Sequence, residues 1–255
     1  MKIRIIISAM IMFFCIAGCQ LSFFKKDGMV KSSPEGLYSR GALEYQEGNY
    51  KKAREYFLRV REEYPLSSLA VLADMGIADS YFSDKGYLSG NGYIEAEGAY
   101  NDFVNLHPTN ENVPYAIYQA GMCHFHQIEA IDRDQTETVK ARKEFEKLIA
   151  RYPDSKFATM AERLLIECKQ KQAEHEFYVG KFYFTQKKYQ AALIRLEKIT
   201  KDFANIGLDS KVEFLMNETK IKIAEEEKVK KDQEAKDKAK EEKKKAKEEQ
   251  KAAQK

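Results

Sequence analysis

The residue types that most often bind metals or catalyse reactions gather at two places in this chain of 255 residues. The first is the run Cys123-His124-Phe125-His126, in which a helix would bring Cys123 and His126 to one face and turn His124 away. A structural zinc site needs about four ligands, and no second cluster in the sequence has matching spacing. We therefore interpret the run as core and groove positions of a helix and predict no metal ligands.

The second place is His175-Glu176, which begins like the helical zinc-protease motif but has Val179 where the second histidine is required. The sequence also lacks a G-x-S-x-G elbow, a phosphate-binding glycine loop and a nucleophile with a recognisable base. Scattered carboxylates in a chain with 33% charged residues are typical of a solvated surface. We predict no catalytic residues and no cofactor; an enzyme acting on the cell wall stays as an alternative.

Cys19 has a different chemistry, because its thiol can accept a lipid. Positive charge within the first four residues precedes an almost unbroken apolar run over residues 5–17, the pattern of an export signal. The run is too short for a transmembrane helix, which needs about 20 residues. Ile16-Ala17-Gly18-Cys19 resembles the bacterial lipobox. We predict a lipoprotein signal peptide over residues 1–18 and an N-acyl diacylglyceryl lipid on Cys19 that anchors the chain; a plain signal peptide with an incidental cysteine is the alternative.

Two further inferences follow from export. Gln20 stands where an aspartate would, by analogy with many Gram-negative bacteria, favour the inner membrane, so we expect the periplasmic face of the outer membrane. Cys15 would leave with the signal and Cys19 would be acylated, so only Cys123 and Cys168 remain. They could form a disulfide in an oxidising compartment, but both lie in helical apolar patterns, which favours two small buried side chains.

The rest of the chain falls into three segments of different composition. Residues 19–33 show no sustained period and predict a flexible lipidated tether. Residues 34–223 carry apolar residues at helical spacing without strand-like alternation. Residues 224–255 form a Lys/Glu-rich tail, helical or disordered, whose 12 Lys and 10 acidic residues contribute +2 to the overall charge of +3. Such interleaved charges give no basic face, so nucleic acid is not expected as a partner.

Residues 34–223 contain an internal repeat. Gly41-(x8)-Tyr50-(x2)-Ala53-(x3)-Phe57-(x2)-Val60-(x4)-Pro65 has the same spacing as Gly180-(x8)-Tyr189-(x2)-Ala192-(x3)-Leu196-(x2)-Ile199-(x4)-Ala204. A small residue in one helix lets the next pack closely, and the later residues form the apolar stripe of the second helix. This spacing resembles the tetratricopeptide repeat, two antiparallel helices in about 34 residues. We predict an all-α solenoid of about five helical hairpins wound as a right-handed superhelix.

Two further units fit the repeat with longer loops, over residues 85–92 and 131–138. Residues 155–184 read as one long helix between the third and fourth repeats, and residues 209–223 as the helix of an incomplete fifth repeat that closes the stack.

A second resemblance combines these features. Besides the lipobox and the repeats, the sequence contains the loop tripeptide Asp132-Arg133-Asp134. The segment Arg151-Tyr152-Pro153-Asp154-Ser155 follows it at a fixed distance. Over roughly residues 16–223 the chain resembles the BamD family, lipoproteins of the outer-membrane β-barrel assembly machinery. It departs from the family at Gln135, where proline is common, at Ala204 in place of the repeat-closing proline, and in the long charged tail.

The resemblance implies a scaffold without enzymatic activity. Its partners would be a BamA-like outer-membrane barrel protein, other lipoproteins of the machinery, and unfolded outer-membrane protein clients. The inner positions of the first helices place Tyr38, Tyr45, Asp79 and Phe82 in the predicted client-peptide groove. At the end of the fourth repeat, charges of both signs flank an aromatic residue, so Arg195, Lys201, Asp202 and Phe203 are predicted to bind the barrel partner. A periplasmic tetratricopeptide lipoprotein of the cell-division or Tol-Pal type is the alternative.

Overall fold

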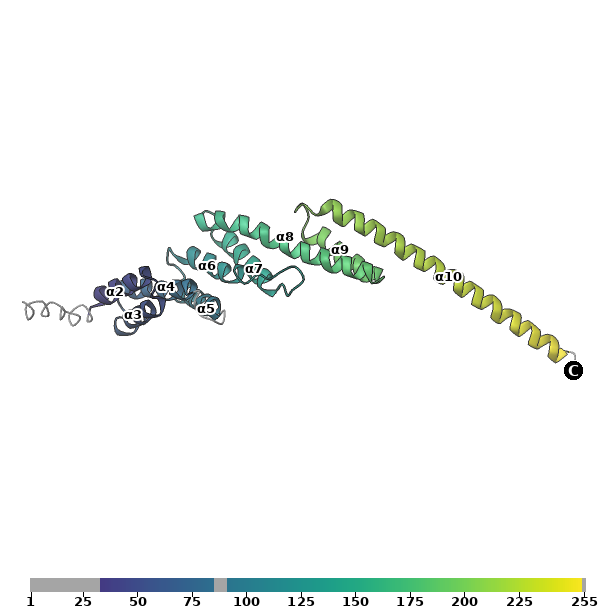
Figure 1. Cartoon of the computed structure of the whole chain (residues 1–255), viewed down its shortest axis with the longest axis horizontal. Helices are drawn as coiled ribbons and strands as arrows, with labels where there is room; N and C mark the ends of the chain where they lie inside the picture. The colour runs from purple at the N-terminus through teal and green to yellow at the C-terminus, as the bar shows by residue number, and fades with distance from the viewer. Residues whose placement is uncertain (1–32, 85–90, 254–255) are drawn as a thin grey trace, which may run out of the picture. The chain divides into compact units, whose positions relative to one another are not determined.

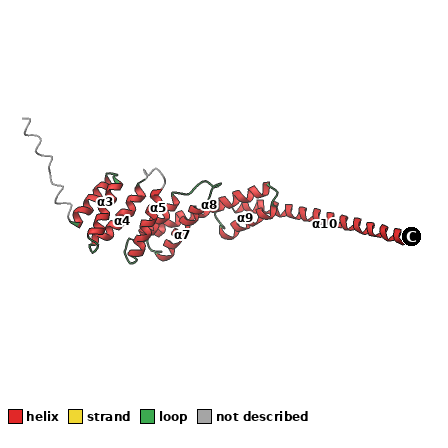
Figure 2. Ribbon diagram, turned by 90° about the horizontal axis from the view of Figure 1, so that it is seen from below, coloured by secondary structure: helices red, strands yellow, loops and turns green. Residues whose placement is uncertain are grey.

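The computed structural model describes residues 33–84 and 91–253, and helices are the only regular secondary structure within these ranges (Figures 1 and 2). The chain divides into two compact units, residues 1–108 and 109–255. The helices of the first unit are α2 (Pro34–Gln46), α3 (Tyr50–Glu63), α4 (Ser68–Ser83) and α5 (Asn91–Leu106). The helices of the second are α6 (Val113–Phe125), α7 (Thr136–Arg151), α8 (Lys156–Thr185), α9 (Tyr189–Asp202) and α10 (Asp209–Ala253).

Consecutive helices pack against one another as hairpins within each unit. Unit 1 contains the pairs α2/α3 and α4/α5, and unit 2 contains α6/α7 and α8/α9, with α10 packed on α9 and α8. This arrangement confirms the predicted all-α, tetratricopeptide-like fold. The predicted fifth repeat is represented in the described residues by its first helix, α10.

Glycine in one helix and an aromatic ring in the next set the closest approach between the helices of a hairpin. A Cβ atom on Gly41 would lie 2.8 Å from Cε1 of Phe57, and one on Gly121 would lie 2.6 Å from Cε1 of Phe145. Gly76 of α4 approaches the other edge of the Phe57 ring, where a Cβ would lie 2.7 Å away. Side chains at these positions would displace a buried ring, so the small residues of the repeat are required by packing.

The residues that begin and end the helices also recur from one hairpin to another. The first helices α2, α4 and α8 each begin after a serine whose Oγ accepts a backbone N–H, with distances of 3.1 to 3.2 Å (Ser33, Ser67 and Ser155). Such caps satisfy a backbone N–H that the helix itself leaves unpaired. The second helices α3, α7 and α9 end at an aromatic residue whose φ lies between −136° and −139° (Tyr64, Tyr152 and Phe203).

The starts of α7 and α5 differ from the loop boundaries that the sequence predicted. The loop expected over residues 131–138 is shorter, because α7 already begins at Thr136, whose backbone N–H donates to Oδ1 of Asp134 over 2.8 Å. Of the loop expected over residues 85–92, residues 91 and 92 belong to α5 and the rest lie outside the described residues.

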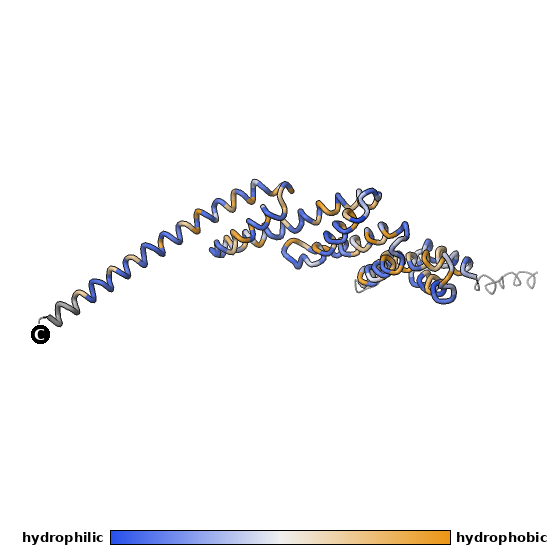
Figure 3. Tube along the Cα trace, turned by 180° about the vertical axis from the view of Figure 1, so that it is seen from behind, coloured by the Kyte–Doolittle hydropathy of each residue, from blue (hydrophilic) through white to orange (hydrophobic). Residues whose placement is uncertain are grey.

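Helix α10 runs without interruption from the folded part into the charged tail. Its first turns alternate buried and exposed residues, with Val212 and Thr219 fully buried, whereas residues 224–246 are exposed throughout. Figure 3 shows the same change as a mostly hydrophilic colouring of the distal helix. In the described part of the chain, no helix has the length and apolar character needed to span a membrane. The predicted signal peptide, Cys19 and the tether before Ser33 lie outside the described residues.

Candidate binding surfaces

The four residues predicted for a client groove lie on α2 and α4 of unit 1, and three of them contact Ser83 or Tyr100. The Tyr45 Oη atom lies 2.8 Å from Ser83 Oγ, one residue beyond Phe82. Asp79 Oδ1 accepts a hydrogen bond of 2.7 Å from the hydroxyl of Tyr100 on α5. The Phe82 ring centroid is 6.4 Å from that of Tyr100. We call Tyr38, Tyr45, Asp79 and Phe82 the tyrosine–aspartate face.

Electrostatics connect the two tyrosines to the aspartate. Burial raises the pKa of Tyr38 above its ordinary value of 10.0, and the negative charge of Asp79 raises it further. Burial also raises the pKa of Tyr45, outweighing the hydrogen bond with Ser83, and Asp79 again adds to the rise. Both hydroxyls therefore stay protonated at neutral pH and can donate hydrogen bonds beside a carboxylate.

All four side chains are half-buried, so each also packs within the unit. The ring of Tyr38 lies 5.4 Å from that of Phe57, and the ring of Phe82 lies 5.5 Å from that of Tyr93. The face thus combines a packing role with a partly accessible polar and aromatic surface.

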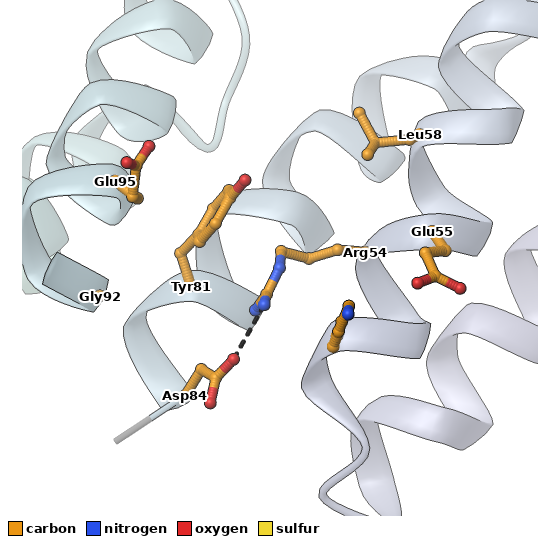
Figure 4. A pocket seen from close by; sticks show the side chains of 8 residues that line it. Arg54, Glu55, Leu58, Tyr81, Asp84, Gly92 and Glu95 are labelled. Atoms are coloured by element: carbon orange, nitrogen blue, oxygen red, sulfur yellow. Dashed lines mark hydrogen bonds and ion pairs between the residues drawn. The ribbon is translucent and has the colours of Figure 1, made fainter. Parts of the chain in front are cut away.

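Arg54 of α3 fixes the end of α4, which carries Asp79 and Phe82. Its guanidinium donates to the carbonyl oxygen of Ser80 over 3.0 Å and to Oδ2 of Asp84 over 2.8 Å, and it lies 4.4 Å above the Tyr81 ring. Figure 4 shows the side chains of Arg54, Tyr81 and Asp84 at a hollow of about 460 Å³, which Glu55 and Glu95 also line. Because Arg54 is buried and its charge is already paired, we assign it a positioning role.

In unit 2, the predicted docking residue Arg195 is paired with a buried carboxylate. Arg195 Nη1 lies 3.0 Å from Oε2 of Glu176 on α8, and Lys198 Nζ lies 2.5 Å from Oε1 of the same group. Burial by itself would raise the pKa of Glu176, but the hydrogen bonds from Lys198 and Arg195 outweigh it and lower the pKa below 4.5. Arg195 is half-exposed, so it can stabilise Glu176 and still contact a partner.

The other predicted docking residues divide into two kinds. Lys201 and Asp202 are exposed at the end of α9. Phe203 is only 6% exposed and packs in the core formed by Ala173, Leu196, Ile199 and Val212. It ends α9 in the same way that Tyr64 ends α3, so its side chain supports this surface from beneath. The alignment of Phe203-Ala204 with Tyr64-Pro65 carried that signal in the sequence.

The histidine-containing segments have structural partners. His124 is buried with Nδ1 2.6 Å from Oε2 of Glu137, whereas His126 is exposed at the end of α6. His175 donates from Nδ1 to the carbonyl oxygen of Ile131 over 2.6 Å and so ties the loop before α7 to α8. Within residues 33–84 and 91–253, no three side chains of the His, Cys, Asp and Glu types form a group suited to a metal ion.

Two further sequence features are explained by local contacts. Gln135 donates from its side-chain amide to the carbonyl oxygens of Ala130 and Arg133 and accepts from Thr138, so its side chain closes the loop before α7. Cys123 and Cys168 are both buried, as expected for small core side chains. Burial raises the pKa of the Cys168 thiol to about 12, which keeps it protonated and unreactive.

Comparisons with known proteins cover both units. The family model described as YfiO, an outer membrane lipoprotein, matches residues 30–239. A protein from Caulobacter vibrioides named outer membrane protein assembly factor BamD is 31% identical over 76% of this chain, which spans 62% of that relative's length. Proteins of the same name from Rickettsia prowazekii and Vibrio cholerae are 28% and 25% identical over 80% and 77% of this chain, and 78% and 82% of their own lengths are covered.

Proposed function

The chain belongs to the YfiO family of outer membrane lipoproteins, and from this premise we propose that it is an assembly factor for outer membrane proteins. In this role it would act as a scaffold, held at the periplasmic face of the outer membrane by a lipid on Cys19. The observation that carries the proposal is the family match over residues 30–239, which includes α2 to α9 and the first part of α10. Relatives named as assembly factors support it.

We further propose that the two units have different partners. The tyrosine–aspartate face of unit 1 receives segments of unfolded outer-membrane protein clients, since half-buried aromatic rings and hydroxyl donors suit an extended peptide. The exposed end of α9, with Arg195, Lys201 and Asp202, binds a BamA-like barrel subunit. Charges of both signs on that surface can complement charges on a partner and fix its orientation.

Purification of the chain from detergent-solubilised outer membranes tests this proposal. We expect a large outer-membrane barrel protein to co-purify with the wild-type chain. The charge swap Lys201→Glu with Asp202→Lys should reduce that barrel protein at least about tenfold, because both residues are exposed and like charges would then face each other. Lys220→Glu, an exposed change on α10, is the matched control and should retain it.

Two further arms of the same experiment separate the parts of the proposal. Phe82→Ser should reduce co-purified unfolded clients while leaving the barrel subunit in place. Cys19→Ala should move the chain from the membrane to the soluble periplasmic fraction. A wild-type chain that brings down no barrel protein at normal yield would contradict the assembly role, and a Cys19→Ala chain that stays in the membrane would contradict the lipid anchor.

A further inference from the structure

An apolar groove of about 530 Å³ is lined by residues of α8 and α10 in unit 2. Its lining combines apolar side chains with two lysines and two hydroxyl residues: Phe177, Lys181, Phe184 and Thr185 on α8, and Ser210, Lys211, Phe214 and Leu215 on α10. The spacing of Phe177, Lys181 and Phe184, four and then three apart, puts them on one side of α8. We call the apolar lining residues Phe177, Phe184, Phe214 and Leu215 the apolar strip.

The groove is exposed although its surface is apolar. The ring of Phe214, which lines the groove, is 70% exposed. Exposed apolar surface that lines a groove is typical of interaction sites. The volume falls within the range of about 300 to 1,000 Å³ that is typical of binding pockets.

The charges at the groove have one sign. Lys181 and Lys211 are its only charged wall residues, both are exposed, and neither belongs to an ion pair within the described part of the chain. By contrast, Lys198 and Lys222 on neighbouring surfaces are paired with Glu176 and Glu225. Two unpaired ammonium groups beside an apolar strip complement carboxylates that flank an apolar side chain.

We propose that this groove binds an acidic segment of a protein partner, in which a large apolar side chain enters the strip and carboxylates on either side pair with Lys181 and Lys211. Burial of the apolar side chain supplies affinity, and the two lysines select the sign of the flanking charges. The proposal does not depend on the assembly role, because it rests on the groove alone.

Fluorescence anisotropy with the full mature chain in lipid nanodiscs tests the proposal. The probe is a labelled acidic peptide, SDELFDES, and the comparison peptides are the basic SKKLFKKS and the apolar-free SDESSDES. We expect saturable binding of the acidic probe, and at least about tenfold weaker binding of each comparison peptide.

Variants then assign the binding to the groove. Phe214→Ser should weaken the acidic probe at least about tenfold, and the double reversal Lys181→Glu with Lys211→Glu should lose it and bind the basic peptide instead. Ile221→Ser on the same helix is the matched control, since Ile221 is 52% exposed and lies outside the groove. Equal binding of the acidic and basic peptides, or unchanged binding by the Phe214 variant, would overturn the proposal. Co-purification of a barrel protein would be unaffected by such a result.

Discussion

The two units of this protein use the same helical frame but present different surfaces. In unit 1, Gly41 packs on Phe57 and α3 ends at Tyr64; in unit 2, Gly121 packs on Phe145 and α7 ends at Tyr152. The exposed faces share no such likeness. Unit 1 presents two tyrosine hydroxyls near the carboxylate of Asp79, whereas unit 2 presents the apolar strip beside two lysines.

This difference shows which positions a helical repeat can vary. A Cβ atom added to Gly41 or Gly121 would lie less than 3 Å from a buried ring, so the same residue type recurs at these positions in the two units. Positions on the accessible side carry no such constraint, and they can acquire opposite charge in the two units. One chain can thereby offer two surfaces that select different partners.

The largest expected effect tests whether the frame is equivalent in the two units. Phe57 and Phe145 are 3% and 0% exposed, so Phe57→Ala and Phe145→Ala should each lower the free energy of unfolding by about 3–5 kcal/mol. Urea unfolding followed by circular dichroism measures both. Phe214→Ala is the matched control on an exposed ring and should change stability by less than about 0.5 kcal/mol. A small loss in one unit only would show that its hairpins are held by other contacts.

A smaller effect concerns the buried carboxylate of unit 2. Glu176→Gln should lower the free energy of unfolding by about 1–2 kcal/mol at neutral pH, because Arg195 and Lys198 are half-exposed and water can replace part of the lost interaction. The folded state lowers the pKa of Glu176, so its contribution is present above about pH 4.5 and is lost as pH falls through the lower folded value.

The control for this prediction is the difference between wild type and variant across pH, since other carboxylates titrate in both proteins. We expect that difference to shrink when urea unfolding is repeated at successively lower pH below about 4.5. A difference that stays constant down to pH 2 would mean that Glu176 is not stabilised in its charged form.

Much of the frame could be predicted from sequence because close packing restricts residue type. The Gly-Tyr-Ala-Phe spacing identified the hairpins, and the continuous helical pattern over residues 155–184 identified α8. The four residues of the tyrosine–aspartate face could be placed together because inner positions of first helices recur with the repeat. Their role as a client site stays a prediction.

The remaining features depend on partners distant in sequence. Arg195 was expected at a surface, but its pairing with Glu176, 19 residues earlier, requires knowing how α8 and α9 face each other. The apolar strip consists of residues from α8 and α10, which belong to two separate amphipathic patterns in the sequence. Phe203 was predicted to contact a partner because it lies next to Lys201 and Asp202, although its side chain is buried.

The smallest expected effect lies in a turn that the two units build with different residues. Gly48 and Lys187 both follow the first helix of a hairpin, and both have positive φ, 79° and 57°. The hydrogen bonds also match, because Gly48 donates to Tyr45 and Lys187 donates to Phe184, each over 3.0 Å. Glycine adopts this conformation without a steric cost, whereas lysine has a Cβ that approaches the following carbonyl.

Lys187→Gly should therefore raise the free energy of unfolding by about 0.5–1 kcal/mol, which is less than the full strain because glycine also gains freedom in the unfolded chain. Gly48→Lys should lower it by about 1 kcal/mol in the same urea experiment. Lys188→Gly, next to the turn, is the control and should not stabilise. If Lys187→Gly does not raise the free energy of unfolding, the two turns differ in more than this one residue. The likeness between the two units would then be limited to their helices.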